Sequence, residues 1–118
     1  MRYLTPIECK AAINANKIIE QLVGRFNVNN FMLIRYLNMF KSQEAKYAVS
    51  LHEVFDDRDE GIENIYDFSH FDPDSSEGVI QYFNTFEDAL NYSKSLGANE
   101  NKFLMDGYLQ EEFLKQNL

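Results

Sequence analysis

The sequence predicts an α+β fold in which helices pack on a small antiparallel sheet of about three or four strands. Two observations support this class. A threonine that can cap a helix precedes apolar residues at helical spacing near each end of the chain, at Thr5 and Thr85. Between these segments, apolar and polar residues alternate from residue 47 onward. The 118 residues contain no internal repeat and no linker-like segment, so we expect one domain over 1–118.

The first expected element is a helix over about residues 6–23. Thr5 is a suitable N-cap, Pro6 fits the first helical position, and Glu8 can complete a capping box. Apolar residues then recur at helical spacing, and Gly24 is placed to end the segment.

Residues 29–42 fit two patterns. Apolar residues recur there at helical spacing, with polar residues together on another face, and this favours a helix. The stretch from Phe31 to Phe40 also fits the alternation of a strand, which stays open as an alternative.

Three strands are expected after residue 46, in an antiparallel meander. They cover residues 47–54, 62–71 and 79–83, and the segments 56–61 and 72–78 between them are rich in turn residues.

Two helices are expected after the strands. Thr85 caps the first, and Gly97 is placed to end it. The terminal helix begins at about Asp106 and buries Leu109 and Phe113, with Leu114 as a further candidate for burial.

The composition excludes several classes of protein. The lone cysteine, Cys9, rules out an internal disulfide and is expected to be buried. The longest apolar run, Phe31 to Ile34, is far shorter than the roughly 20 residues of a membrane-spanning helix. A helix start follows the N-terminus before a signal-peptide apolar region could develop. We therefore expect a cytoplasmic protein that does not bind membranes.

Acidic residues are concentrated in one part of the chain. The sequence holds 11 Lys and Arg against 19 Asp and Glu, a net charge of −8. Up to Lys46 there are 7 basic and 3 acidic residues, or +4, whereas the remainder has 4 and 16, or −12. Between Glu53 and Glu77, ten carboxylates stand against one cation, Arg58. Such a field repels nucleic acids and anionic membranes, so we expect a basic or neutral partner and no direct nucleic-acid binding.

Large apolar residues are interleaved with these carboxylates, which predicts an ordered acidic surface and not a solvated tail. Ordered carboxylates repel one another, and a cationic partner would relieve that repulsion. Tyr66 and Phe68, or Tyr82, are expected to be partly exposed beside them, as is typical of an interface with aromatic anchors. The candidate partner-binding residues are Asp56, Asp57, Asp59, Glu60, Glu63, Tyr66, Asp67, Asp72, Asp74 and Glu77.

Signatures of catalysis and of cofactor binding are nearly absent. The five glycines lie far apart and form no phosphate-binding loop. No base is recognisable for a nucleophile at Cys9. Two Asp-rich segments resemble fragments of a calcium loop but do not place a glycine where that loop requires it. We expect no catalytic residue, no cofactor and no metal ligand.

From about Lys46 onward the chain resembles the small immunity proteins of bacterial contact-dependent growth inhibition and related polymorphic toxin systems. The resemblance rests on Glu53-Val54-Phe55-Asp56-Asp57, Phe71-Asp72-Pro73-Asp74, the segment 85–92 and the segment 106–113. It covers a little over half of the chain. It implies a non-enzymatic protein that binds and blocks the toxic domain of a delivered effector, often a nuclease with a basic groove.

The charge pattern and the resemblance together predict an immunity protein that neutralises a specific toxin domain, a basic nuclease, by direct occlusion through its acidic face. Two other classes stay open. A nucleic-acid mimic that inhibits a DNA-binding protein would need the same charge. A small metal-binding or ion-binding protein would use His52 or His70 with nearby carboxylates. The carboxylates could also serve only to keep a Phe-rich fold in solution.

Overall fold

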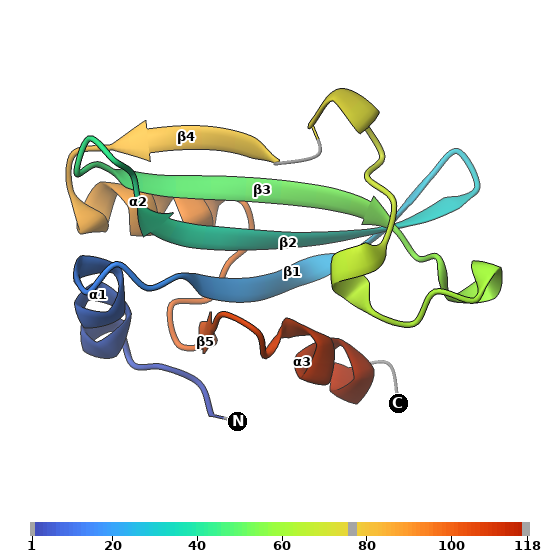
Figure 1. Ribbon diagram of the computed structural model, residues 1–118, viewed down its shortest axis with the longest axis horizontal. Helices are drawn as coiled ribbons and strands as arrows, with labels where there is room; N and C mark the ends of the chain where they lie inside the picture. The colour runs from blue at the N-terminus through green and yellow to red at the C-terminus, as the bar shows by residue number, and fades with distance from the viewer. Residues whose placement is uncertain (1, 76–77, 117–118) are drawn as a thin grey trace.

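Five antiparallel strands form one sheet at the centre of the computed structural model, which describes residues 2–75 and 78–116 (Figure 1). The strand order across the sheet is β4-β3-β2-β1-β5, and each strand runs antiparallel to its neighbours. The α+β class is therefore confirmed, with five strands in place of the three or four expected. The strands are β1 (Ile19–Val28), β2 (Phe31–Lys41), β3 (Tyr47–Phe55), β4 (Val79–Phe83) and β5 (Leu104–Met105).

Three α-helices accompany the sheet: α1 (Pro6–Asn14), α2 (Phe86–Ser95) and α3 (Leu109–Gln116). The predicted capping box is present at α1, where the amide of Glu8 donates to Thr5 Oγ1 at 3.2 Å and the amide of Thr5 donates to Glu8 Oε1 at 3.0 Å. None of the helices in 2–75 and 78–116 combines the length and the apolar character that crossing a membrane requires.

The helix expected over residues 6–23 stops after 9 residues, and the second half of that range belongs to β1. Asn16 adopts a left-handed backbone conformation, with φ 61°. The amide of Lys17 then bonds to the carbonyl of Ala12 across 2.9 Å and closes the helix end. The stop signal is thus an asparagine, which tolerates this conformation better than most residues. Gly24 lies instead at an irregularity in the pairing of β1 with β2.

The segment in which helical spacing favoured a helix is the central strand β2, so the strand alternative is the correct one. Consecutive residues such as Leu33 and Ile34, or Tyr36 and Leu37, point to opposite faces of the sheet, and all four are buried. A strand that is covered on both faces is apolar on both faces, which removes the simple alternation of a half-exposed strand. The helical spacing of apolar residues in this segment therefore does not reflect a helix.

The strand expected over residues 62–71 is also wrong. Its middle forms a 3₁₀ turn (Ile65–Asp67), and only its end joins the sheet, through a bridge between His70 and Val54. The amide of Ile65 donates to Gln110 Oε1 at 2.6 Å, so a side chain from α3 satisfies a group that a strand would have used. Phe68, expected to be partly exposed, is buried at 2% exposure.

The sheet has two faces, and each is covered over part of its length. On the first, which we call the helix face, α1 and α2 pack on Ile19, Met39 and Val49. On the second, the loop face, α3 and the 3₁₀ turn pack on Ile34 and Val54. The two coverings lie toward opposite ends of the strands, and the long loop after β3 lies at the same end as the β1–β2 turn (Figure 1).

Most of the other local predictions are confirmed. β3, β4 and α2 lie close to their predicted ranges. In α3, Leu109 and Phe113 are buried, whereas Leu114 is 47% exposed. Cys9 is buried in α1, and burial raises the pKa of its thiol to about 11.

Candidate protein-binding surface

Three phenylalanine rings from separate segments form a row on the half of the helix face that lies away from α1 and α2. Phe31 opens β2, Phe55 ends β3, and Phe71 lies in the segment that bonds beside β3. Successive rings meet edge to face, with centroids 5.4 Å apart for Phe31 and Phe55 and 5.7 Å apart for Phe55 and Phe71. We call this row the aromatic strip. Phe31 is 54% exposed and Phe71 44%, so the strip presents ring surface to solvent.

The strand register places these rings on one face. Side chains alternate along β2, so Phe31 and Leu33 share a face, and Leu33 pairs directly with Phe55. The amide of Phe71 donates to the carbonyl of Glu53 at 2.9 Å. Phe71 therefore lies beside Glu53 on the face that also carries Phe55.

An arginine stacked on an aromatic ring extends this surface. The guanidinium carbon of Arg35 lies 4.1 Å from the centroid of the Phe26 ring, and its Nε lies 3.2 Å from Glu53 Oε2. Arg35 and Glu53 are also direct neighbours in the pairing of β2 with β3. Because both backbones are fixed, this ion pair has a defined geometry despite its partial exposure.

Predicted partner-binding carboxylates border one end of the aromatic strip. Asp57, Asp59 and Glu60 line a hollow of ≈ 450 Å³ together with Phe31 and Phe55. Asp59 and Glu60 are exposed. Across 2–75 and 78–116 neither of these two carboxylates makes a hydrogen bond or an ion pair, which leaves both available to a partner.

Asp56 holds the loop together and has little exposed surface. Its carboxylate is 12% exposed and bonds to Arg58 at 2.5 Å and to Arg25 at 3.1 Å. The hydrogen bond from the Arg58 side chain is the main reason why the pKa of Asp56 lies below its ordinary value. Asp57 has a similar role, because its Oδ2 accepts the amide of Ser69 at 2.7 Å. Arg58, the single cation between Glu53 and Glu77, is therefore paired with a carboxylate of the same segment.

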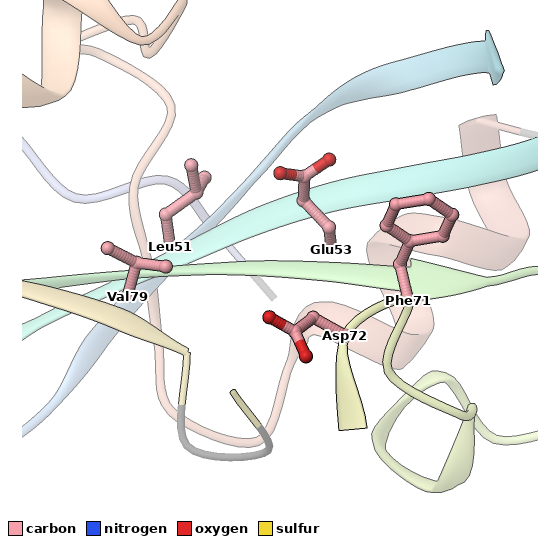
Figure 2. A pocket seen from close by; sticks show the side chains of 5 residues that line it. All are labelled: Leu51, Glu53, Phe71, Asp72 and Val79. Carbon is pink, nitrogen blue, oxygen red and sulfur yellow. The ribbon is translucent and has the colours of Figure 1, made fainter. Parts of the chain in front are cut away.

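Asp72 borders the other end of the strip. With Phe71, Leu51, Glu53 and Val79 it lines a pocket of ≈ 250 Å³ (Figure 2). The amide of Asp74 donates to Asp72 Oδ1 at 3.0 Å and holds this turn. Asp74 is exposed and does not belong to the lining. Carboxylates therefore flank the aromatic strip at both ends.

The remaining predicted residues lie elsewhere. Glu63, Tyr66 and Asp67 are exposed, but their segment packs through Ile65 and Phe68 over the loop face, away from the aromatic strip. The structure therefore divides the predicted acidic surface between two faces of the sheet. Glu77 lies outside the described residues.

The two histidines meet on the loop face. His52 Nδ1 lies 3.3 Å from His70 Nε2, and His52 Nε2 lies 3.2 Å from Ser50 Oγ. Burial, with a smaller contribution from His70, lowers the pKa of His52 to about 4, so this ring is neutral near pH 7. In the part of the chain that the structure describes, no three His, Cys, Asp or Glu residues are placed to hold a metal ion.

Sequence reasoning missed the aromatic strip and pointed to other rings. Tyr66 and Tyr82 are partly exposed as expected, at 39% and 55%, but neither lies in the strip. One local signal was available for Phe31. Asn29 and Asn30 both have positive φ, and an Asn-Asn pair between two apolar runs is typical of a tight hairpin turn. That turn would have predicted a β1–β2 hairpin with Phe31 at its start.

The fold and this surface define an α+β protein with an exposed aromatic strip that is bordered by carboxylates. Comparison with known proteins gave no match: no family model, no curated protein and no solved structure is recognisably similar to this chain. The resemblance of residues 46–118 to immunity proteins therefore stays a prediction from the sequence.

Proposed function

We propose that this protein is an immunity protein, which binds the toxic domain of a bacterial effector, a basic nuclease, and blocks it by occlusion. The observation that carries the proposal is the combination on one face of exposed aromatic rings with carboxylates at both ends of their row. The class of partner is suggested by the sequence resemblance. The surface itself supports a partner that is basic and makes apolar contact.

The two kinds of residue would act at different stages of binding. Exposed aromatic rings such as Phe31 and Phe71 bury large areas at low cost in side-chain entropy, so they are suited to slow dissociation. Carboxylates at the rim of an interface mainly accelerate encounter with a basic surface. Their range is short, since the Debye length is about 8 Å at physiological salt. Asp59 and Glu60 at the rim would therefore accelerate association with the partner, and the aromatic rings would slow its dissociation.

Charge reversal at matched positions tests the role of the rim. The partner would be the purified toxic domain of the effector encoded beside this gene. Glu60→Lys changes the charge beside the strip, and Glu44→Lys makes the same change at an exposed residue of the turn between β2 and β3. At low salt we expect Glu60→Lys to slow association about fivefold and Glu44→Lys to change it less than twofold.

Removal of a ring tests the role of the strip. Phe31→Ala should accelerate dissociation of the toxic domain by about tenfold or more, as expected for an aromatic anchor of an interface. Failure of the unmodified protein to bind or inhibit this domain would refute the proposal. Equal slowing by Glu60→Lys and Glu44→Lys would show that only net charge matters, and would refute the acidic rim as the steering element.

A further inference from the structure

The sheet has two edges, and only one of them carries the features that usually keep strands of different molecules from pairing. Such features are short edge strands, charged side chains, prolines and bulges. At one edge, β5 has 2 residues, and β1 beyond it carries Arg25 and an irregularity at Gly24. At the other edge, the 5 residues of β4 pair with β3 in unbroken register and include no charged residue and no proline. The β4 edge therefore lacks these features.

The strand register shows which backbone groups of β4 face outward. The amide of Phe55, in β3, donates to the carbonyl of Ser69 on the side away from β2. Backbone direction alternates along a strand, so the odd-numbered residues of β3 bond to their partners in β4, which are Val79, Gln81 and Phe83. The N–H and C=O groups of Ile80 and Tyr82 therefore point away from β3. No segment of 2–75 and 78–116 pairs with that side of β4, which is the outermost strand in Figure 1.

The side chains along this edge are uncharged, although the chain is acidic. Residues 78–86 contain no Asp, Glu, Lys or Arg, and this is the longest such run after Lys46. Tyr82 is 55% exposed and shares the loop face with Ile80. A strongly basic partner is expected to meet carboxylates, which this edge lacks. A second copy of the chain also carries a charge of −8, so it can approach best where charged side chains are absent. The charge pattern therefore favours a second copy.

We propose that β4 pairs with β4 of a second copy of this chain, antiparallel, about a two-fold axis at Gln81. Ile80 of each copy then lies opposite Tyr82 of the other, and every outward N–H and C=O group of these two residues is hydrogen-bonded. Isoleucine opposite tyrosine is a favourable cross-strand pair, and no like charges face each other. The pairing joins the two five-stranded sheets into one and uses no residue of the aromatic strip.

Sedimentation equilibrium of the full chain measures the association. We expect a monomer–dimer equilibrium with a dissociation constant of about 100 μM or lower, as is reasonable for a small interface. Raising the salt from about 0.05 M to about 0.5 M should strengthen the dimer about threefold or more, because salt screens the repulsion between two acidic molecules. A protein that stays monomeric at about 1 mM, or a dimer that dissociates as salt rises, would overturn the proposal.

Charge substitutions test the interface and its register. Tyr82→Lys and Ile80→Glu should each weaken self-association about tenfold or more, since each places a charge against an uncharged neighbour. An equimolar mixture of the two variants should associate again, to within about threefold of wild type, because the introduced cation then lies opposite the introduced carboxylate. Tyr108→Lys is the control, at a ring that is 45% exposed and follows β5 at the other edge, and it should change association less than about twofold.

Hydrogen exchange locates the contact without any substitution. In the wild-type protein, exchange of the Ile80 and Tyr82 amide hydrogens should slow about threefold or more between about 10 μM and about 1 mM protein, as these groups become bonded in the dimer. Unchanged exchange at both residues, no recovery in the mixture, or an equal effect of Tyr108→Lys would overturn the proposal.

Discussion

The Tyr66 hydroxyl donates to Glu20 Oε2 across 2.6 Å and joins the acidic segment after β3 to the first strand of the sheet. The Tyr66 hydroxyl oxygen also accepts the amide of Leu109 at 3.2 Å, so the hydroxyl links three segments of the chain. Glu20 is only 1% exposed. Burial is the main reason why its pKa rises to about 7, and Asp106 adds to the shift. Tyr66 thus combines an exposed ring with a hydroxyl that is bonded inside the protein.

The first prediction concerns Glu20 and pH. The folded protein binds a proton at Glu20 up to about pH 7, whereas the unfolded chain releases it near the ordinary value of 4.5. Stability from this group is therefore present at low pH and is lost as the pH rises through 7. The Glu20→Gln side chain cannot ionise, so the variant does not lose this stability as the pH rises. Its free energy of unfolding relative to wild type should increase by about 2 kcal/mol between pH 5 and pH 7, measured by urea unfolding.

Glu63→Gln provides the control, because Glu63 is exposed. It makes the same chemical change at a residue outside the core. A difference between Glu20→Gln and wild type that does not change with pH would show that Glu20 does not hold its proton in the folded protein.

The second prediction concerns His52, which acts in the opposite direction. Its pKa is about 4 in the folded protein against an ordinary value of 6.5, so its contribution is present above pH 6.5 and is lost as the pH falls through 4. His52→Gln cannot ionise. Its free energy of unfolding relative to wild type should decrease by about 2 kcal/mol between pH 5 and pH 7. An increase over this interval would contradict the assignment of a neutral, buried ring.

The third prediction separates binding phenylalanines from structural ones. Phe113 is 0% exposed and packs edge to face on Phe68 at 5.7 Å. Phe113→Ala should cost about 4 kcal/mol of unfolding free energy, because it leaves a cavity in the loop-face core. Phe31 is 54% exposed, and Phe31→Ala should cost less than about 1 kcal/mol. Chemical denaturation of both variants measures the two losses of unfolding free energy. Similar losses would mean that the aromatic strip serves stability and not binding.

The fourth prediction compares two glycines with nearly the same backbone. Gly61 has φ +84°, and apart from its chain neighbours no atom of the described residues lies within 4 Å of a methyl group added there. Gly61→Ala should therefore cost about 1 kcal/mol, from the backbone alone. Gly78 has φ +83°, and a methyl group there would collide with Ser50 Oγ and with the carbonyl oxygen of Leu51. Gly78→Ala should cost at least about 2 kcal/mol, as seen by thermal and urea unfolding. Equal costs would show that the segment before β4 can move away from β3.

Local sequence determined those elements that depend on local interactions. Thr5 and Thr85 cap their helices with their own side chains, and the strands at 47–55 and 79–83 lie at their predicted positions. The concentration of acidic residues after Glu53 is likewise a property of the sequence alone. The helix caps and the charge pattern need no distant part of the chain.

Tertiary structure decided which segments became central strands and which rings stayed exposed. β2 is buried on both faces, so no one-sided pattern marks it as a strand. Phe68 and Phe71 are three residues apart and equally apolar, yet the first fills the core and the second borders a pocket. The reason is that Phe68 packs on α3, whereas the backbone of Phe71 bonds beside β3 on the helix face. Such contacts join residues far apart in the chain, and the short-range pattern around each residue does not encode them.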